Sequence, residues 1–253
     1  MDVSGQVAVI TGGGSGLGAA TARMLAAKGA KIAAFDLNME GAEAVADETG
    51  GMALECDVSD AKSGEAAFEA VAATLGAPRI LVNCAGVATA GRIVGREGPL
   101  ALDNYRRVVE INLIGTFNMI RLAAAGMQSL EALDGGERGV IINTASVAAY
   151  DGQIGQAAYA SSKGGVVGLT LPAARELARF GIRVMTIAPG IFGTPMLLGM
   201  PQEVQDSLAA MVPWPPRLGQ PEEYGALAMH IIENQMLNGE VIRLDGAIRM
   251  APK

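Results

Sequence analysis

Several residue types that other classes of protein depend on are scarce in this sequence. Its 253 residues include 2 cysteines, 1 histidine, 4% aromatic residues and 18% charged residues. Two cysteines are too few for a disulfide scaffold, and Cys56 and Cys84 lack the CxxC or Cys/His spacing of a zinc site. We therefore expect two reduced structural thiols and no metal centre.

Positive charge and long uninterrupted apolar runs are also scarce. The net charge is −7 and no basic run occurs, so the overall field repels nucleic acid and anionic membranes. The uncharged stretch 184–202 contains Pro189, Pro195 and Pro201, which argue against a membrane-spanning helix. The six residues before the first predicted strand leave no room for a signal peptide. These absences predict a soluble, cytoplasmic protein that binds neither nucleic acid nor membrane.

Short apolar runs alternate with stretches of helical period along the whole chain. The predicted strands are 7–11, 31–36, 52–57, 80–84, 139–145, 182–188 and 241–244, and the predicted helices are 16–28, 39–49, 59–75, 102–125, 157–179 and 221–233. Strands and helices that alternate in this way form a parallel sheet through right-handed crossovers. We predict an α/β fold, with one doubly wound Rossmann-type domain over residues 1–253.

One long stretch, at about 190–219, has no regular pattern. It is rich in leucine, methionine and proline and follows a predicted strand of the sheet. Long apolar loops of this kind often cover a ligand, so we predict a substrate lid. The alternative is a loop that packs on a neighbouring subunit.

A glycine-rich loop follows the first predicted strand directly. The sequence Gly12-Gly-Gly-Ser-Gly16-Leu-Gly18 opens the first predicted helix. Glycine allows a tight turn and a close approach of backbone N–H groups to a pyrophosphate, which the helix N-terminus then stabilises. A nucleotide P-loop is excluded because no Gly-Lys-Ser/Thr ends the loop. The context predicts a dinucleotide site.

Asp36 ends the second predicted strand, 18 residues after Gly18. A carboxylate at this place accepts hydrogen bonds from both ribose hydroxyls of NAD and repels the 2′-phosphate of NADP. Leu37 and Asn38, which follow, provide no arginine for such a phosphate. We therefore expect NAD as the cofactor, with an ordinary turn residue as the alternative role of Asp36.

Tyr159 and Lys163 are four residues apart on one predicted helix, so both side chains emerge on the same face. A tyrosine with a pKa of about 10 is a poor base at neutral pH, and a neighbouring ammonium together with a cationic nicotinamide would lower that pKa. Ser146 follows a predicted strand at its carboxyl end, where its hydroxyl would polarise a carbonyl, and Asn112 interrupts an apolar helix face. Taken singly, each residue also has a structural interpretation, as a turn or packing residue.

Taken together and in order, these features resemble the short-chain dehydrogenase/reductase family over nearly the whole chain. The matching segments are TGGGSGLG at 11–18, Asp57-Val58, NCAG at 83–86, Asn112, Ser146, YASSK at 159–163 and Pro189-Gly190. The family usually has NNAG where this chain has Cys84, a change that conserves size. The resemblance implies a seven-stranded sheet and hydride transfer between NAD and an alcohol carbon.

The resemblance also implies roles for individual residues. Tyr159 would transfer the proton, Ser146 would orient the oxygen, and Lys163 would bind the nicotinamide ribose and lower the tyrosine pKa. Asn112 would hold a water molecule of the proton relay. The positions implied for the cofactor are Gly12, Ser15, Leu17, Gly18, Asp36, Asp57, Val58, Cys84, Ala85, Gly86, Tyr159, Lys163, Pro189, Phe192 and Thr194. Family members commonly form tetramers through the helices that correspond to 102–125 and 157–179, so a homotetramer is expected.

Further segments resemble one group within the family, the type II 3-hydroxyacyl-CoA dehydrogenases. They include AYDGQ at 149–153, VPWPPRLG at 212–219 and NGEVIRLDGAIRM at 238–250. The group's substrate-contacting positions correspond to Ser146, Gln153 and Tyr159. An extra stretch occupies 92–99, where Arg92 and Arg96 would either meet the phosphates of coenzyme A or lie solvated on the surface.

The resulting hypothesis is an NAD-dependent oxidoreductase of fatty acid metabolism that interconverts 3-hydroxyacyl-CoA and 3-oxoacyl-CoA. Two alternatives stay open. One is a dehydrogenase of steroids or other secondary alcohols, and the other is a non-catalytic scaffold that uses the NAD-bound fold as an interaction surface. An assay of NADH absorbance separates an enzyme from a scaffold.

Overall fold

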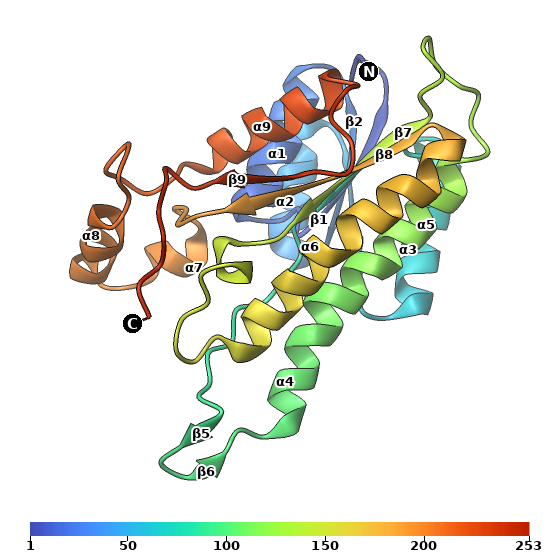
Figure 1. Cartoon of the computed structure of the whole chain (residues 1–253). Coiled ribbons are helices and arrows are strands. Elements are labelled where there is room, and N and C mark those ends of the chain that lie inside the picture. Colours follow the sequence, from blue (N-terminus) through green and yellow to red (C-terminus); the bar gives the residue numbers. More distant parts are fainter. Residues whose placement is uncertain (253) are drawn as a thin grey trace.

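Seven parallel strands form one sheet in the order β3-β2-β1-β4-β7-β8-β9 (Figure 1). This computed structural model describes residues 1–252, so Lys253 of the predicted domain lies outside the described residues. The strands are β1 (Val7–Thr11), β2 (Lys31–Asp36), β3 (Met52–Glu55), β4 (Ile80–Asn83), β7 (Gly139–Thr144), β8 (Ile182–Pro189) and β9 (Val241–Leu244). The predicted seven-stranded parallel sheet is confirmed.

Helices cover both faces of this sheet. On one face lie α1 (Gly16–Ala27), α2 (Met39–Thr49) and α9 (Pro221–Glu233), and on the other lie α3 (Ala61–Thr74), α5 (Gly115–Met127) and α6 (Ala157–Leu177). Successive strand residues point to opposite faces, so Ile10 packs in the first layer and Val9 in the second. Both faces of a parallel sheet are buried in this way, which explains the continuous apolar runs of its strands.

Local signals in the sequence account for the element boundaries. The α2 helix begins after Asn38, whose side chain accepts a hydrogen bond from the Gly41 N–H, and ends at Gly50 with a φ of 62°. The α9 helix begins with Pro221 at its first position, behind a capping box formed by Gln220 and Glu223. These caps explain why the predicted and observed bounds of α2 and α9 agree.

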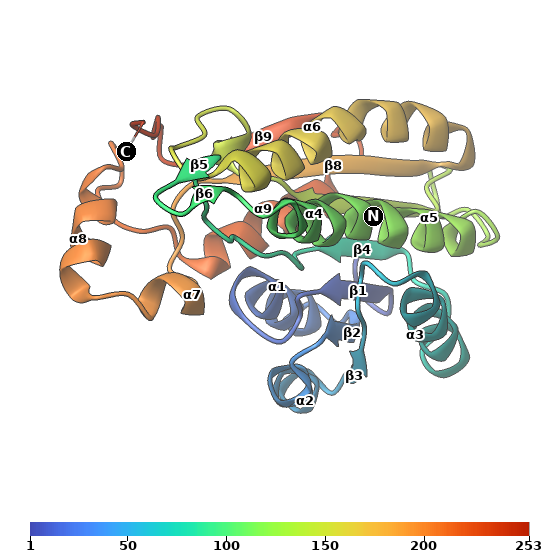
Figure 2. The same ribbon diagram turned by 90° about the horizontal axis from the view of Figure 1, so that it is seen from below.

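The strand order reverses direction between β1 and β4, which are neighbours in the sheet although β2 and β3 lie between them in sequence. In doubly wound folds ligands bind in the crevice at the carboxyl ends of the strands beside this switch point. The β5–β6 hairpin (Val94–Gly95 and Gly98–Pro99), α7 (Pro195–Leu198) and α8 (Gln202–Ala210) all lie beyond these strand ends (Figure 1, Figure 2). They frame the region where a ligand would bind.

The structure corrects the prediction of an irregular stretch at 190–219, because α7 and α8 lie inside it. Prolines suggested a loop, but Pro195 is the first residue of α7 and Pro201 is the N-cap of α8. At a helix start proline loses no hydrogen bond and presets φ. The prolines therefore begin these helices instead of breaking them.

A second correction concerns the predicted helix 102–125. It consists of α4 (Leu102–Val109), a π-helical turn η1 (Glu110–Ile114) and α5, and continues to Met127. The combined helix, Leu102–Met127, is long and apolar enough to cross a membrane, but half of its most apolar window is buried inside the protein. Core helices of this kind pass the same test, so this feature is weak evidence for a membrane span.

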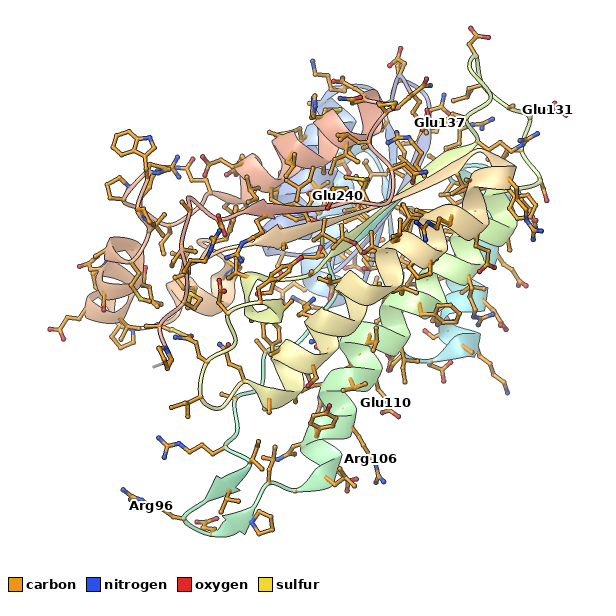
Figure 3. All side chains as sticks on the ribbon, viewed as in Figure 1. Arg96, Arg106, Glu110, Glu131, Glu137 and Glu240 are labelled. Atoms are coloured by element: carbon orange, nitrogen blue, oxygen red, sulfur yellow. The ribbon has the colours of Figure 1, made fainter. Side chains whose placement is uncertain are left out.

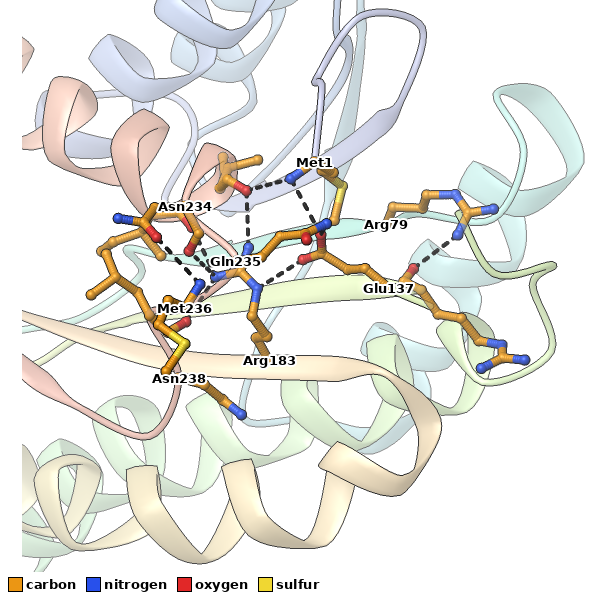
Figure 4. A network of polar contacts seen from close by, with 12 residues as sticks. Met1, Arg79, Glu137, Arg183, Asn234, Gln235, Met236 and Asn238 are labelled. Atoms are coloured by element: carbon orange, nitrogen blue, oxygen red, sulfur yellow. Dashed lines mark hydrogen bonds and ion pairs between the residues drawn. The ribbon is translucent and has the colours of Figure 1, made fainter. Parts of the chain in front are cut away.

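The amino ends of the strands are held together by a buried ion pair (Figure 4). Arg183 of β8 lies 2.8 Å from a carboxylate oxygen of Glu137 and donates to the carbonyls of Ile231, Ile232 and Leu237. All three nitrogens of this buried guanidinium donate to an acceptor, which offsets the cost of burying its charge. This cluster secures the end of α9 against the sheet, at the edge opposite the predicted site.

Candidate active site

A cleft of about 570 Å³ runs over the carboxyl ends of the central strands. Its lining contains eleven of the predicted cofactor residues, namely Gly12, Ser15, Leu17, Gly18, Asp36, Asp57, Val58, Cys84, Ala85, Gly86 and Thr194. These residues come from five separate parts of the sequence. The fold thus brings together the set that the family resemblance implied for a dinucleotide.

The glycine loop that opens α1 is packed too tightly for larger residues. A Cβ at Gly18 would lie 2.2 Å from the carbonyl oxygen of Gly12, and a Cβ at Gly12 would lie 2.8 Å from the amide nitrogen of Ala85. The first turn of α1 has no acidic residue, and its N-cap Ser15 makes no side-chain capping bond. The free N–H groups and the positive end of the helix dipole therefore face the cleft, which suits a pyrophosphate.

Asp36 lies at one end of this cleft with its carboxylate fixed by the backbone. One oxygen accepts from the Gly14 N–H and the other from the Asn38 N–H, each at 3.0 Å. A Cβ at Gly14 would lie 3.0 Å from the first of these oxygens, so glycine allows the loop to approach the carboxylate. The geometry fits a carboxylate held ready for ribose hydroxyls.

A second cavity of about 430 Å³ adjoins the cleft, and both are lined by Leu17, Cys84, Gly86, Val87 and Thr194. Predicted residues that line this cavity are Ser146, Gln153, Tyr159, Lys163, Pro189 and Phe192. A ligand in the cleft therefore extends directly to the predicted catalytic side chains. The remaining predicted residue, Asn112, is fully buried behind them.

Ser146 and Tyr159 form the reactive end of the second cavity. The Ser146 hydroxyl oxygen accepts from the Ala148 N–H at 3.1 Å, which leaves its own proton free to be donated. Burial raises the pKa of Tyr159 and is the larger influence, whereas the neighbouring Ser146 acts to lower it. The expected lowering of the tyrosine pKa is thus not produced by the protein's own groups, and any lowering must come from a bound positive charge.

Lys163 is 5% exposed and lies behind Tyr159, with its ammonium 5.9 Å from the centre of the phenol ring. The ammonium donates to the carbonyl oxygen of Thr144 at 2.7 Å, and burial lowers its pKa to about 8. Two of its three N–H donors stay available for a ligand. Lys163 and Tyr159 emerge from the same face of α6, as their spacing predicted.

Asn112 lies in the π-helical turn η1, where the altered backbone turns its side chain away from the regular helix face. Its amide oxygen accepts from the Val87 N–H at 2.8 Å, and its amide nitrogen donates to the Val87 carbonyl and the Ser162 hydroxyl. Both N–H groups of the amide are therefore occupied. A water molecule of a proton relay would therefore have to donate to an Asn112 oxygen, either the amide oxygen or the main-chain carbonyl, each of which already accepts one hydrogen bond.

The sequence interpretation did not identify several residues that line these cavities. Leu197, Met200 and Leu208 of the second cavity lie in the predicted lid, but Arg107, Glu110 and Ile111 of the cleft and Met250 of the second cavity were not predicted. No local motif marks them, because each reaches its cavity only through tertiary packing. The one available signal was the helical spacing of Arg107 and Ile111 on the helix that carries Asn112.

The 92–99 stretch forms the exposed β5–β6 hairpin, with Arg96 at its outer end (Figure 3). Arg92 lines a third cavity, of about 610 Å³, which shares Gln153 and Gln156 with the second cavity. Arg92 thus lies beside the route into the predicted active site, whereas Arg96 projects into solvent.

Comparison with known proteins gives concordant results. A family model described as "short chain dehydrogenase" matches residues 6–204. The chain is 54% identical to a 3-hydroxyacyl-CoA dehydrogenase type-2 of Homo sapiens, over 99% of this chain and 97% of that protein. It is 35% identical to an ipsdienol dehydrogenase of Ips pini, over 98% of each protein. A crystal structure of 3-hydroxyacyl-CoA dehydrogenase type-2 from Mycobacterium avium superposes with a TM-score of 0.94 and 44% identity, covering 98% of both chains.

Proposed function

Because the chain belongs to the short-chain dehydrogenase/reductase family, we propose that it interconverts 3-hydroxyacyl-CoA and 3-oxoacyl-CoA with NAD as its cofactor. It is an oxidoreductase that uses a nicotinamide cofactor. The observation that carries the proposal is the junction of the two cavities, since Asp36 lines only the first and Tyr159 only the second, and five residues line both. An extended dinucleotide that binds Asp36 in the first cavity would therefore end beside Ser146 and Tyr159 in the second.

NAD is favoured over NADP by the environment of Asp36. Its carboxylate is fixed by two backbone N–H groups, and the neighbouring Leu37 is exposed and apolar. A 2′-phosphate at this place would meet a negative charge without a compensating arginine from Leu37 or Asn38. The cofactor supplies or accepts the hydride when it is bound.

The protein's own groups divide the remaining chemistry. The Ser146 hydroxyl donates to the substrate oxygen, and the Tyr159 phenol gives that oxygen a proton during reduction and takes it back during oxidation. The free N–H groups of Lys163 hold the nicotinamide ribose, which would bring the positive charge of the oxidised cofactor beside the Tyr159 phenol. Asn112 fixes the relative position of α6 and the Val87 segment through Ser162.

The acyl-CoA substrate is supported by the shape and lining of the second cavity. Ile191 and Phe192, which come shortly after β8, and Leu197, Met200 and Leu208 further along the lid provide an apolar wall for an acyl chain. The cavity continues past Gln153 and Gln156 toward Arg92. The thioester and the remainder of coenzyme A would extend on this side, where Arg92 offers a positive charge to its phosphates.

The test compares acetoacetyl-CoA with free acetoacetate in NADH-dependent reduction. Both carry the same reacting carbonyl, but the coenzyme A moiety adds remote binding energy that stabilises the transition state. We expect kcat/KM to be at least about 10²-fold higher for acetoacetyl-CoA, equivalent to about 3 kcal/mol. Equal values would overturn the acyl-CoA assignment and favour a dehydrogenase of small secondary alcohols.

We also propose a homotetramer and a cytoplasmic location. Ile114 of η1, Phe117 of α5 and Leu171 of α6 are exposed apolar residues, which supports association through these helices. Light scattering of the purified protein tests the tetramer, with a monomer as the contradicting result. Fractionation of the source cells tests the location, and recovery in a membrane or organelle fraction would contradict it.

A further inference from the structure

The 245–252 segment follows β9 and returns across the mouth of the second cavity. A turn at Gly246 and Ala247, both with positive φ, reverses the chain, and the Asp245 carboxylate accepts from the Ala247 N–H at 3.0 Å. A Cβ at Gly246 would lie 2.5 Å from a Val212 side-chain carbon, so glycine permits close packing on the end of the lid. The turn thereby directs the next residues toward the substrate cavity.

Three hydrogen bonds fix this segment on both sides of Met250. The Arg243 guanidinium donates to the Ile248 carbonyl at 3.0 Å, and its other contacts join it to Asp151 and Asp245. On the far side, the Gln153 amide donates to the Ala251 carbonyl and the Ile154 N–H donates to the Pro252 carbonyl, each at 3.0 Å. Gln153, predicted to contact substrate, therefore also anchors this segment.

Apolar packing fixes the side chains of the segment as well. Ile248 is 1% exposed and forms a small cluster with Val147 and Val212, against which Met250 packs. Val147 directly follows Ser146, so the cluster connects Met250 to the reactive end of the cavity. Met250 itself lines the cavity, on the same side of the extended chain as Ile248.

The lid side chains opposite Met250 are held much less firmly. The α8 helix, which carries Leu208, has no buried residue, and Met200 lies exposed between α7 and α8. A weakly packed lid adapts to the ligand beneath it, whereas a wall held by hydrogen bonds on both sides does not. Met250 is therefore held more firmly than the lid side chains that line the same cavity.

We propose that Met250 is the specificity-determining residue that limits the length of the acyl chain. The inference rests on the proposed acyl-CoA function and names the residue that selects among its substrates. Met250→Ala removes three side-chain atoms from the fixed wall and opens room for a longer chain. Met250→Phe narrows the same space and disfavours chains longer than four carbons.

The experiment measures kcat/KM for acetoacetyl-CoA and 3-oxooctanoyl-CoA with NADH in the wild type and both variants. One accommodated methylene changes kcat/KM by roughly tenfold or more, so Met250→Ala should raise the ratio of long to short substrate at least about tenfold. Met250→Phe should lower that ratio by a similar factor. Met236→Ala is the matched control, because Met236 is 92% exposed and lies outside the cavity lining.

Each outcome has one meaning. Opposite shifts in the two Met250 variants, with an unchanged ratio in Met236→Ala, support the inference. An unchanged ratio in folded Met250→Ala and Met250→Phe that still reduce acetoacetyl-CoA overturns the inference and leaves the proposed function intact. A wild type that reduces neither thioester overturns the proposed function instead.

Discussion

Replacing Lys163 with methionine should stabilise the protein while it abolishes most activity. Burial lowers the pKa of the Lys163 ammonium from 10.5 to about 8. One pKa unit corresponds to about 1.4 kcal/mol, so holding this charge in the folded protein below pH 8 costs about 3 kcal/mol. Lys163→Met keeps the apolar stem and removes the charge. It also leaves the Thr144 carbonyl without its 2.7 Å donor, a loss of about 1 kcal/mol.

The expected net gain is about 2 kcal/mol at pH 7, or a rise in Tm of roughly 4–8 °C for a protein of this size. At the same time kcat should fall by about 10²-fold or more, because the cofactor loses the N–H donors of Lys163 that position its nicotinamide ribose beside Tyr159. A gain in stability together with a loss of activity is the signature of a charge retained for function.

The pH dependence of the stability gives a second readout. Between pH 8 and 10.5 the unfolded state keeps a proton on Lys163 that the folded state has lost, so the wild type gains stability from this group as pH rises. The advantage of Lys163→Met should therefore be greatest below pH 8 and disappear as pH approaches 10.5.

Urea denaturation followed by circular dichroism at pH 7 to 10 measures both effects. Lys62→Met, at an exposed position on α3, is the matched control and should change the free energy of unfolding by less than about 0.5 kcal/mol. A Lys163→Met protein that is less stable than the wild type at pH 7, or more stable by the same free energy at every pH, would show that the buried charge does not destabilise the folded wild type.

Three further changes test the remaining parts of the site. Tyr159→Phe should lower kcat by about 10²–10⁴-fold, whereas NADH binding, measured by fluorescence titration, should stay close to that of the wild type. A variant that keeps more than about a tenth of the activity would contradict proton transfer by Tyr159. Asp36→Ala should raise kcat/KM with NADP relative to kcat/KM with NAD by roughly tenfold, because the carboxylate's repulsion of the 2′-phosphate, about 1–4 kcal/mol, is lost. NAD should stay the better cofactor, since no cation is gained. An unchanged ratio in steady-state kinetics would show that Asp36 does not contact the ribose. Gly18→Ala should weaken NADH binding and cost about 1–3 kcal/mol of stability, since its Cβ would lie 2.2 Å from the Gly12 carbonyl oxygen. Gly126→Ala is the control and should be neutral or stabilising, because no atom lies within 4 Å of its Cβ. Equal calorimetric melting temperatures for the two variants would contradict the packing argument.

The parts of the fold with a strong repeating pattern were predictable from the sequence. β1, β2 and β9 and helices α2 and α9 have the predicted bounds, because buried apolar runs and capping residues determine them locally. The predicted strand 52–57 ends earlier, at Glu55, because the last residues turn to hold Asp57, whose carboxylate accepts from Ser59. The short helix α8 was missed because it has no apolar face buried against the core. Its stability depends on contacts with the rest of the lid, which leave no pattern in the sequence.

The residues of the candidate site likewise divide into those that local motifs predict and those that only tertiary contacts bring into the site. Motif residues such as Gly18, Ser146 and Tyr159 lie at strand ends or on one helix face, so their meeting follows from topology. The π-helical turn at Asn112 and the approach of Met250 depend on contacts between segments far apart in sequence, with Val87 in one case and with Val147 in the other. Such contacts leave no periodic signal, and the structure is needed to find them.

Hydride transfer to an acyl-CoA substrate is tested most directly with NADH that carries deuterium at both C4 positions. The protein is incubated with acetoacetyl-CoA and this cofactor, and the 3-hydroxybutyryl-CoA product is examined by mass spectrometry. We predict one deuterium atom per product molecule, located at C3 of the acyl chain. Oxidation of NADH without deuterium at C3, or no product at all under these conditions, would contradict the account.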